Sequence, residues 1–265
     1  MDERVMSFGE HLIELRKRIF VSMISVIVAF VVIFFIFDKY LLEVMKWPIY
    51  RVLESMGRGE ESQKFLQALK PAEAFLTVMK TAFGAAIVAA VPIWLYELWM
   101  FVAPGLKPRE RRAIFPALFF GVFLFAIGAL VAYLLMIPVM LRYLLGYTLS
   151  MGVSANWTLS GYLEFEFILM AAFGIAFELP LVITILTLVG MVTPRMLTSN
   201  RRYAILIMFI AAAVLTPGPD VLSQIMMALP LLVLYEVSIW LSKIFYKRRW
   251  RGLDELHTSE PPDGG

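Results

Sequence analysis

Two glutamates stand among basic residues beside long apolar stretches. Glu14 lies in SFGEHLIELRKRI, and Glu110 lies in APGLKPRERR. If both lie at the same face of a membrane, they form a pair that can receive a basic ligand, because carboxylates bind guanidinium groups bidentately. The alternative is local pairing, in which Glu14 bonds Arg18 one helical turn away and contributes about 0.2–0.5 kcal/mol. The residues alone leave both interpretations open.

Two further charged residues fall inside apolar stretches. Glu178 stands in FGIAFELP, two residues before Pro180. Intramembrane carboxylates cost about 2.5–3.5 kcal/mol on insertion scales and usually face a protein interior or water. Glu178 is therefore a candidate functional polar site, and the alternative is a neutral acid that bonds backbone freed by Pro180. Lys80 is interpreted as a structural counter-ion, a base that snorkels outward, or a partner of Glu73.

Polar residues also occupy predicted helix ends. Asp220 is placed to cap the helix that contains Gln224 in its first turn. Glu97 stands in WLYELWMF and Glu236 in LYEVSIW, near the predicted cytoplasmic ends of their helices. Both are interpreted as snorkelling or interfacial acids.

The sequence lacks the residue sets of common catalytic and metal sites. It contains no Cys, which excludes disulfides and thiolate metal sites. Its two His residues, His11 and His257, lie near opposite ends of the chain. It contains no HExxH or GxSxG motif. We therefore expect no metal, no cofactor, no enzymatic activity and no nucleic-acid partner.

The elements that carry these residues are predicted to be membrane helices. The chain has 265 residues and is 60% hydrophobic, whereas a soluble domain is nearer half apolar. The apolar residues gather in runs of roughly 20, the length that crosses a hydrocarbon core of about 30 Å. The first run lacks a signal-peptide cleavage site, so it should remain as a helix. The runs predict six helices, at about 19–41, 73–102, 113–146, 161–189, 203–215 and 221–245.

The fifth predicted helix is short. The stretch TPGPD at 216–220 contains two prolines, which cannot continue a helix. This leaves about 13 residues for helix five, or roughly 20 Å at 1.5 Å per residue. A helix of this length should thin the membrane locally or lie against longer neighbours.

The basic residues predict that both termini are cytoplasmic. With the N-terminus inside, 16 of the 24 Lys and Arg residues lie in predicted cytoplasmic segments, in line with the positive-inside rule. Residues 1–246 then form one transmembrane domain, and residues 247–265 form a tail whose composition predicts disorder. The external segment 42–72 is expected to contain short helices. Ser7 begins a capping box that would start a helix near Phe8.

Five motifs in a fixed order resemble the TatC family, the multispanning core of the twin-arginine protein translocase. They are HLIELRKRI, PAEAFLTVMK, APGLKPRERR, FGIAFELP and TPGPDVLSQIMMALPLLVLYE, and the resemblance runs from about residue 8 to residue 245. It implies an all-α integral membrane protein with six transmembrane helices, a glove-like shape and short helices five and six. It also implies a receptor for twin-arginine signal peptides that supports export of folded proteins, driven by the proton-motive force.

The resemblance further implies the partners and the location. The expected partners are signal peptides of folded precursor proteins, the single-span proteins TatA and TatB, further copies of the same chain and the lipid bilayer. The expected location is the cytoplasmic (inner) membrane of a prokaryote.

Residues already singled out match the family's functional positions. The signal-peptide site maps to Glu14 and Glu110, with Arg16 as a further matching position in the first motif. The family's intramembrane acid maps to Glu178. The polar positions that contact TatA and TatB in the family also include two residues near the start of helix six, which match Asp220 and Gln224.

One position departs from the family pattern. Where the family commonly has Gln after Tyr in a YQxW-like stretch, this chain has Glu97. Glu97 is either a third acid at the cytoplasmic face and part of the signal-peptide site, or a protonated acid in place of an amide. The alternative function is a proton-coupled secondary transporter that uses Glu178. The predicted rim position of Glu14 and Glu110 favours a peptide receptor.

Overall fold

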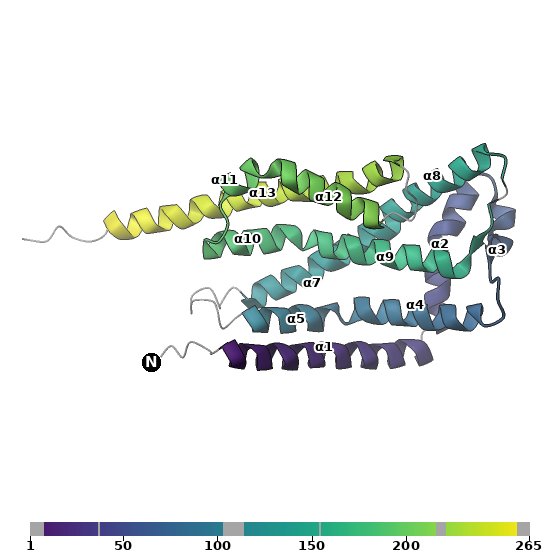
Figure 1. Cartoon of the computed structure of the whole chain (residues 1–265), viewed down its shortest axis with the longest axis horizontal. Coiled ribbons are helices and arrows are strands. Elements are labelled where there is room, and N and C mark those ends of the chain that lie inside the picture. Colours follow the sequence, from purple (N-terminus) through teal and green to yellow (C-terminus); the bar gives the residue numbers. More distant parts are fainter. Residues whose placement is uncertain (1–7, 37, 103–113, 154, 216–220, 259–265) are drawn as a thin grey trace, which may run out of the picture. The chain divides into compact units, whose positions relative to one another are not determined.

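The computed structural model describes residues 8–36, 38–102, 114–153, 155–215 and 221–258, which are predominantly helical (Figure 1). The chain divides into two units, Met1–Gly174 and Ile175–Gly265, and each is described by itself. Among the described residues, four helices are long and apolar enough to cross a membrane, and one bent helix pair makes a fifth such span. A shorter apolar helix, α12 (Arg201–Leu215), makes the sixth.

The first unit begins with α1 (Phe8–Ile36), which starts well before the predicted residue 19. Its first turns contain Leu, Glu, Arg and Lys, which favour helix, so the basic flank and the apolar run form one helix. The predicted capping residue, Ser7, lies outside the described residues. The side chains of Ile24, Ile27 and Val28 are exposed, as expected of a helix that faces lipid.

The segment predicted to be external, 42–72, folds into short elements, as predicted. It contains α2 (Asp38–Ser55), the 3₁₀ helix η1 (Gly59–Glu61), α3 (Ser62–Phe65) and β1 (Leu66–Gln67). Strand β1 pairs in parallel with β2 (Trp157–Thr158), in the register Leu66 to Trp157 and Gln67 to Thr158. The Phe65 and Trp157 rings meet edge to face at 5.4 Å. This pairing joins two connecting segments that are far apart in the sequence.

Helix α2 contains Pro48, which has no N–H to donate to the carbonyl of Val44. The hydroxyl of Tyr133 donates to that carbonyl at 2.6 Å. The hydroxyl of Tyr162 donates to the next carbonyl, that of Met45, at 2.8 Å. Two tyrosines from the membrane spans therefore satisfy the backbone around the proline.

The second predicted helix is a bent pair. It consists of α4 (Glu73–Ala89) and α5 (Val91–Val102), which meet at an angle of 45° around Ala90. Pro92 follows the break, and a proline removes one backbone hydrogen bond and clashes with the preceding turn. Helix α1 packs against both halves of the pair (Figure 1).

The third predicted span continues to Ser150, beyond the predicted end at 146. It contains α7 (Ile114–Val131), one π-helical turn, η3 (Ala132–Met136), and α8 (Ile137–Ser150). Pro138 lies in the first turn of α8. The missing N–H of this proline accounts for the local widening to a π turn.

The fourth predicted span is α9 (Leu159–Phe177) followed by α10 (Leu179–Val189), with a break at Glu178. Pro180 lies at the start of α10, so this break also coincides with a proline. Helix α10 ends where Gly190 adopts a left-handed conformation with φ 89°, which favours glycine.

In the second unit, α10 is followed by α11 (Pro194–Ser199), α12 and α13 (Val221–Thr258). A buried cluster joins them, made of Ala176, Ile183, Met208, Leu231, Tyr235 and Ile239. Helix α12 has 15 residues, so the prediction of a short helix five is confirmed. Helix α13 has 38 residues, of which 27 form its apolar span, so the expectation of a short helix six is wrong.

The predicted tail is corrected in part. Helix α13 continues past the predicted end at 245 and includes the charged residues up to Thr258. Lys, Arg, Leu and Glu in this stretch favour helix, and no proline interrupts it before 261. The rest of the predicted tail, residues 259–265, lies outside the described residues.

Candidate functional site

The first motif presents an ion pair on α1. Arg18 Nη2 lies 3.0 Å from Glu14 Oε1, one helical turn away. This is the local pair that the sequence offered as one interpretation of Glu14, and the structure confirms it. Both side chains are largely buried, with exposed fractions of 21% for Arg18 and 16% for Glu14. The pair is therefore less screened by water than one on a solvated helix surface.

Glu97 on α5 extends this pair to a cluster of three charges. Arg18 Nη1 lies 2.8 Å from Glu97 Oε2, across two helices and 79 residues of sequence. The exposed fraction of the Glu97 side chain is 10%. One guanidinium thus bridges two carboxylates. We call Glu14, Arg18 and Glu97 the α1–α5 charge cluster.

The backbone explains why these side chains meet. Helix α1 packs along both α4 and α5. One turn before Glu14, His11 stacks on Phe101 of α5, with ring centroids 4.3 Å apart and an interplanar angle of 22°. The aromatic contact and the Arg18–Glu97 bond lie about two turns apart on α1 and about one turn apart on α5. Two separate contacts of this kind fix the register of α1 against α5.

An apolar groove adjoins the charge cluster. It has a volume of about 630 Å³ and is formed by α1, α4 and α5. Arg18 and Glu97 line it, and among the described residues they are its two charged lining side chains. Its apolar walls include Leu15, Ile19, Met23, Ile87, Trp94 and Phe101. The site therefore offers a polar end with two carboxylates beside a hydrocarbon-like surface.

Two other residues of the predicted signal-peptide site have different positions. Arg16 is exposed on α1. Glu110 lies outside the described residues, so its predicted place beside Glu14 stays a prediction.

Glu178 lies at the break between α9 and α10. Its backbone carbonyl accepts from Val182 at 2.9 Å, and its side chain is half-buried. The Oε1 atom is buried without a hydrogen-bond partner among the described residues. The predicted bond between a neutral Glu178 and backbone freed by Pro180 is therefore not formed by this oxygen.

Gln224 has a defined partner. Its side-chain amide donates to the carbonyl of Phe209 at 2.9 Å, which ties the first turn of α13 to α12. In the second unit, Gln224 thus helps to hold the short helix against its neighbour. Asp220, the predicted cap of α13, lies outside the described residues.

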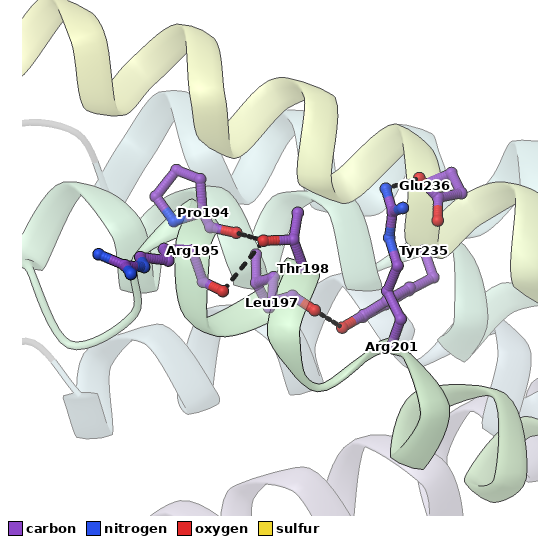
Figure 2. A network of polar contacts seen from close by, with 7 residues as sticks. All are labelled: Pro194, Arg195, Leu197, Thr198, Arg201, Tyr235 and Glu236. Carbon is purple, nitrogen blue, oxygen red and sulfur yellow. Dashed lines mark hydrogen bonds and ion pairs between the residues drawn. The ribbon is translucent and has the colours of Figure 1, made fainter.

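A second polar network lies where α11, α12 and α13 meet (Figure 2). The Tyr235 hydroxyl donates to the carbonyl of Leu197 at 3.0 Å, and Arg201 Nη2 lies 2.7 Å from Glu236 Oε2. Glu236, predicted as an interfacial acid, therefore has a basic partner. Both charged side chains are about half exposed, so the pair contributes roughly 0.2–1 kcal/mol. The ion pair joins α12 to α13, and the Tyr235–Leu197 bond joins α11 to α13.

Of the three interpretations of Lys80, the pairing with Glu73 is wrong. Lys80 Nζ lies 3.9 Å from Glu164 Oε2 on α9, and both side chains are well exposed. Glu73 instead accepts hydrogen bonds from the backbone N–H groups of Leu69 and Lys70, at 2.6 and 3.2 Å. Seven residues of helix separate Glu73 from Lys80 by about 10.5 Å, which is too far for an ion pair.

Sequence reasoning missed Glu166. This side chain is 0% exposed within α9, and both of its carboxyl oxygens lack a hydrogen-bond partner among the described residues. Tyr162, one turn before it, gives its hydroxyl proton to Met45. An acid about one and a half turns inside the predicted helix 161–189 was the available signal. No group of three or more His, Asp or Glu residues in the described chain is arranged to hold a metal ion.

Most of the chain matches a known family of membrane proteins. The family model described as Sec-independent protein translocase protein (TatC) matches residues 10–230. The chain belongs to the TatC family. It is 38% identical to the Sec-independent protein translocase protein TatC of Desulforapulum autotrophicum, over 99% of this chain and 93% of that protein. It is 37% identical to the TatC of Aquifex aeolicus, over 92% of this chain and 98% of that protein.

Solved structures agree with this assignment. A crystal structure of the twin arginine translocase receptor TatC matches with a TM-score of 0.77 and 36% identity, covering 89% of this chain and 99% of that one. A second, in DDM, matches with the same TM-score at 37% identity. The chain is therefore a multi-pass membrane protein with the TatC fold and a component of the Sec-independent translocase. This membership favours the translocase over the proton-coupled transporter.

Proposed function

We propose that this TatC-family chain binds twin-arginine signal peptides through Glu14, Glu97 and Glu110 and so recruits folded precursors for export. The observation that carries the proposal is the α1–α5 charge cluster, in which two carboxylates already bind a guanidinium at 2.8 and 3.0 Å. A site that holds one arginine side chain has the hydrogen-bond acceptors and charge that a second arginine requires.

The apolar groove beside the cluster supports the same proposal. A signal peptide carries basic residues followed by an apolar stretch. Here Glu97 and Arg18, which bonds Glu14, line a groove whose walls are otherwise formed mainly by apolar residues of α1, α4 and α5. A peptide whose arginines bind at the cluster can place its apolar stretch along these walls and bury it from water.

The orientation and the remaining partners are part of the proposal. We place both termini in the cytoplasm of a prokaryote, because most Lys and Arg residues then lie in cytoplasmic segments. The proposed partners in the membrane are further copies of the chain and the single-span proteins TatA and TatB, with Glu178, Gln224 and Asp220 at the contacts. Partly unsatisfied polar groups within membrane spans are suited to bonds across helices, and Glu178 Oε1 is such a group. The proton-motive force is the proposed energy source.

Site-specific crosslinking tests the proposed function. A peptide with two arginines and a photoreactive group is mixed with membranes that contain the wild-type chain or the Glu14→Ala/Glu110→Ala variant. Loss of charge-assisted bonds, each worth about 1.5–3 kcal/mol, should reduce crosslinking at least roughly tenfold. Arg16 is expected to contribute less, since its charge has the same sign as the ligand.

The control variant is Glu60→Ala, which removes an exposed acid from η1 in the external segment. It should leave crosslinking unchanged, and a Lys-Lys peptide should crosslink poorly to every variant. Equal crosslinking of the wild type and the double variant would show that Glu14 and Glu110 are not part of the binding site. Copurification of a twin-arginine precursor with the wild-type chain provides an independent check.

A further inference from the structure

Arg18 fills an arginine subsite with a side chain of the protein itself. Its guanidinium uses Nη1 for Glu97 Oε2 and Nη2 for Glu14 Oε1. These are the same kinds of donor and acceptor that a bound peptide arginine would use. In this conformation, both acids of the cluster are therefore engaged before any ligand binds.

The cluster is unbalanced in charge and in hydrogen bonding. It contains two carboxylates and one guanidinium, so it retains one net negative charge. Each carboxylate bonds Arg18 through a single oxygen. Among the described residues, Glu14 Oε2 and Arg18 Nε are buried without a hydrogen-bond partner. A bidentate arginine–carboxylate pair leaves fewer atoms without a hydrogen-bond partner. An incoming guanidinium can therefore bond atoms of the cluster that Arg18 leaves unbonded.

The position of Arg18 lets it exchange with a ligand. Arg18 and Glu97 line the apolar groove, and 21% of the Arg18 side chain is exposed. Its long stem allows the guanidinium to move away while the methylene groups stay packed on apolar surface. The basic neighbours Arg16 and Lys17 on α1 are exposed, so water screens their effect on the cluster.

We propose that Arg18 is an internal competitor for the peptide's arginine: it neutralises Glu14 and Glu97 in the empty receptor and is displaced from one of them when a twin-arginine peptide binds. This inference rests on the proposed function. It assigns Arg18 a role in specificity. Exchange of one guanidinium for another conserves the bonds to the carboxylate, whereas a lysine ammonium is a point charge that cannot replace the planar fork. Displacement of Arg18 therefore costs a lysine peptide more binding free energy than it costs an arginine peptide.

A purely structural role for Arg18 predicts different behaviour. If the Glu14–Arg18–Glu97 bonds only hold α1 against α5, their loss loosens the groove and weakens binding of every peptide. If Arg18 competes with the ligand, its removal strengthens binding. It also reduces the discrimination between arginine and lysine, because the peptide no longer has to displace a guanidinium.

The test measures peptide affinity of the full-length chain in lipid nanodiscs by fluorescence anisotropy. The probes are a twin-arginine signal peptide and the same peptide with two lysines. For Arg18→Gln, we expect roughly three- to tenfold tighter binding of the arginine peptide, and a smaller affinity ratio between the two peptides. Lys17→Gln is the matched control: it removes the same charge from an exposed position on α1 and should change both affinities equally and by less.

A second variant distinguishes the competitor role from an effect of misfolding. Arg18→Lys keeps the charge but cannot bridge two carboxylates with a planar fork, so it should tighten arginine-peptide binding to a lesser extent than Arg18→Gln. The melting temperature of each variant reports whether the helices remain packed. If the wild type does not bind the arginine peptide, the proposed function fails. If the wild type binds it and folded Arg18 variants bind it equally or more weakly, the competitor role of Arg18 fails.

Discussion

Gly174 provides a quantitative test of how closely the helices of the first unit pack. A Cβ at this position of α9 would lie 2.5 and 2.6 Å from Cε2 and Cζ of Phe125 on α7, whereas carbon atoms normally pack at about 3.5–4.0 Å. Phe125 is buried with Val91 and Ala129, so its ring has little room to move. Overpacking of this kind costs about 1–3 kcal/mol, and alanine returns up to about 1 kcal/mol of helix propensity.

Gly174→Ala should therefore lower the free energy of unfolding by up to about 2 kcal/mol. The matched control is Gly146→Ala in α8, where a new Cβ meets no atom within 4 Å and only the gain in propensity applies. The two variants should differ by about 1–3 kcal/mol. Tryptophan fluorescence in detergent micelles, recorded against denaturant, measures the difference.

The packing explanation also predicts a rescue. In the Gly174→Ala background, Phe125→Leu removes the ring edge that the new methyl group meets and should recover part of the lost stability, although the same change alone is destabilising. Equal unfolding of Gly174→Ala and Gly146→Ala would refute the close contact between α7 and α9. A lack of rescue would show that the new methyl group destabilises the protein through a neighbour other than Phe125.

Two buried acids give further predictions. Glu166→Met keeps the volume of a fully buried side chain and removes two oxygens that have no hydrogen-bond partner in the described part of the chain. It should therefore raise the free energy of unfolding by about 1–3 kcal/mol in the same denaturant assay. A loss of stability would show that the carboxyl is bonded. Glu178 Oε1 has no hydrogen-bond partner among the described residues, and the proposed role of this side chain is hydrogen bonding to a partner. Glu178→Gln should therefore largely preserve export of a folded reporter, and Glu178→Ala should impair it. Equal damage from both substitutions would point to charge or proton exchange instead.

The positions of the membrane helices could be predicted because hydrocarbon thickness fixes their length. The short fifth helix follows from a different signal, the two prolines of TPGPD, which cannot continue a helix, and α12 does end at Leu215. The bends could not be read from apolar content. Pro92 and Pro180 lie within long hydrophobic runs, and a proline can either kink or end a helix. Packing against neighbours decides between these outcomes.

The candidate site could be predicted only in its local part. The Glu14–Arg18 pair follows from a spacing of four residues, and the structure contains it. The bond from Arg18 to Glu97 joins residues 79 positions apart, and no periodicity specifies such a partner. Glu97 departs from a family pattern, but this departure does not indicate which residue it contacts. The contact depends on how α1 packs against α5.

Prolines and polar side chains occur together in this chain, which suggests how a membrane protein can position charges without loops. Each break frees backbone groups that must be satisfied, because lipid offers no hydrogen bonds. At Pro48 the hydroxyls of Tyr133 and Tyr162 do this. The break at Ala90 bends α4 and α5 by 45° while both halves remain packed on α1, and Glu97 lies on the second half, where it meets Arg18. The half of the span that carries Glu97 thus stays in contact with α1 beyond the bend, and the proposed recognition of arginine uses that contact.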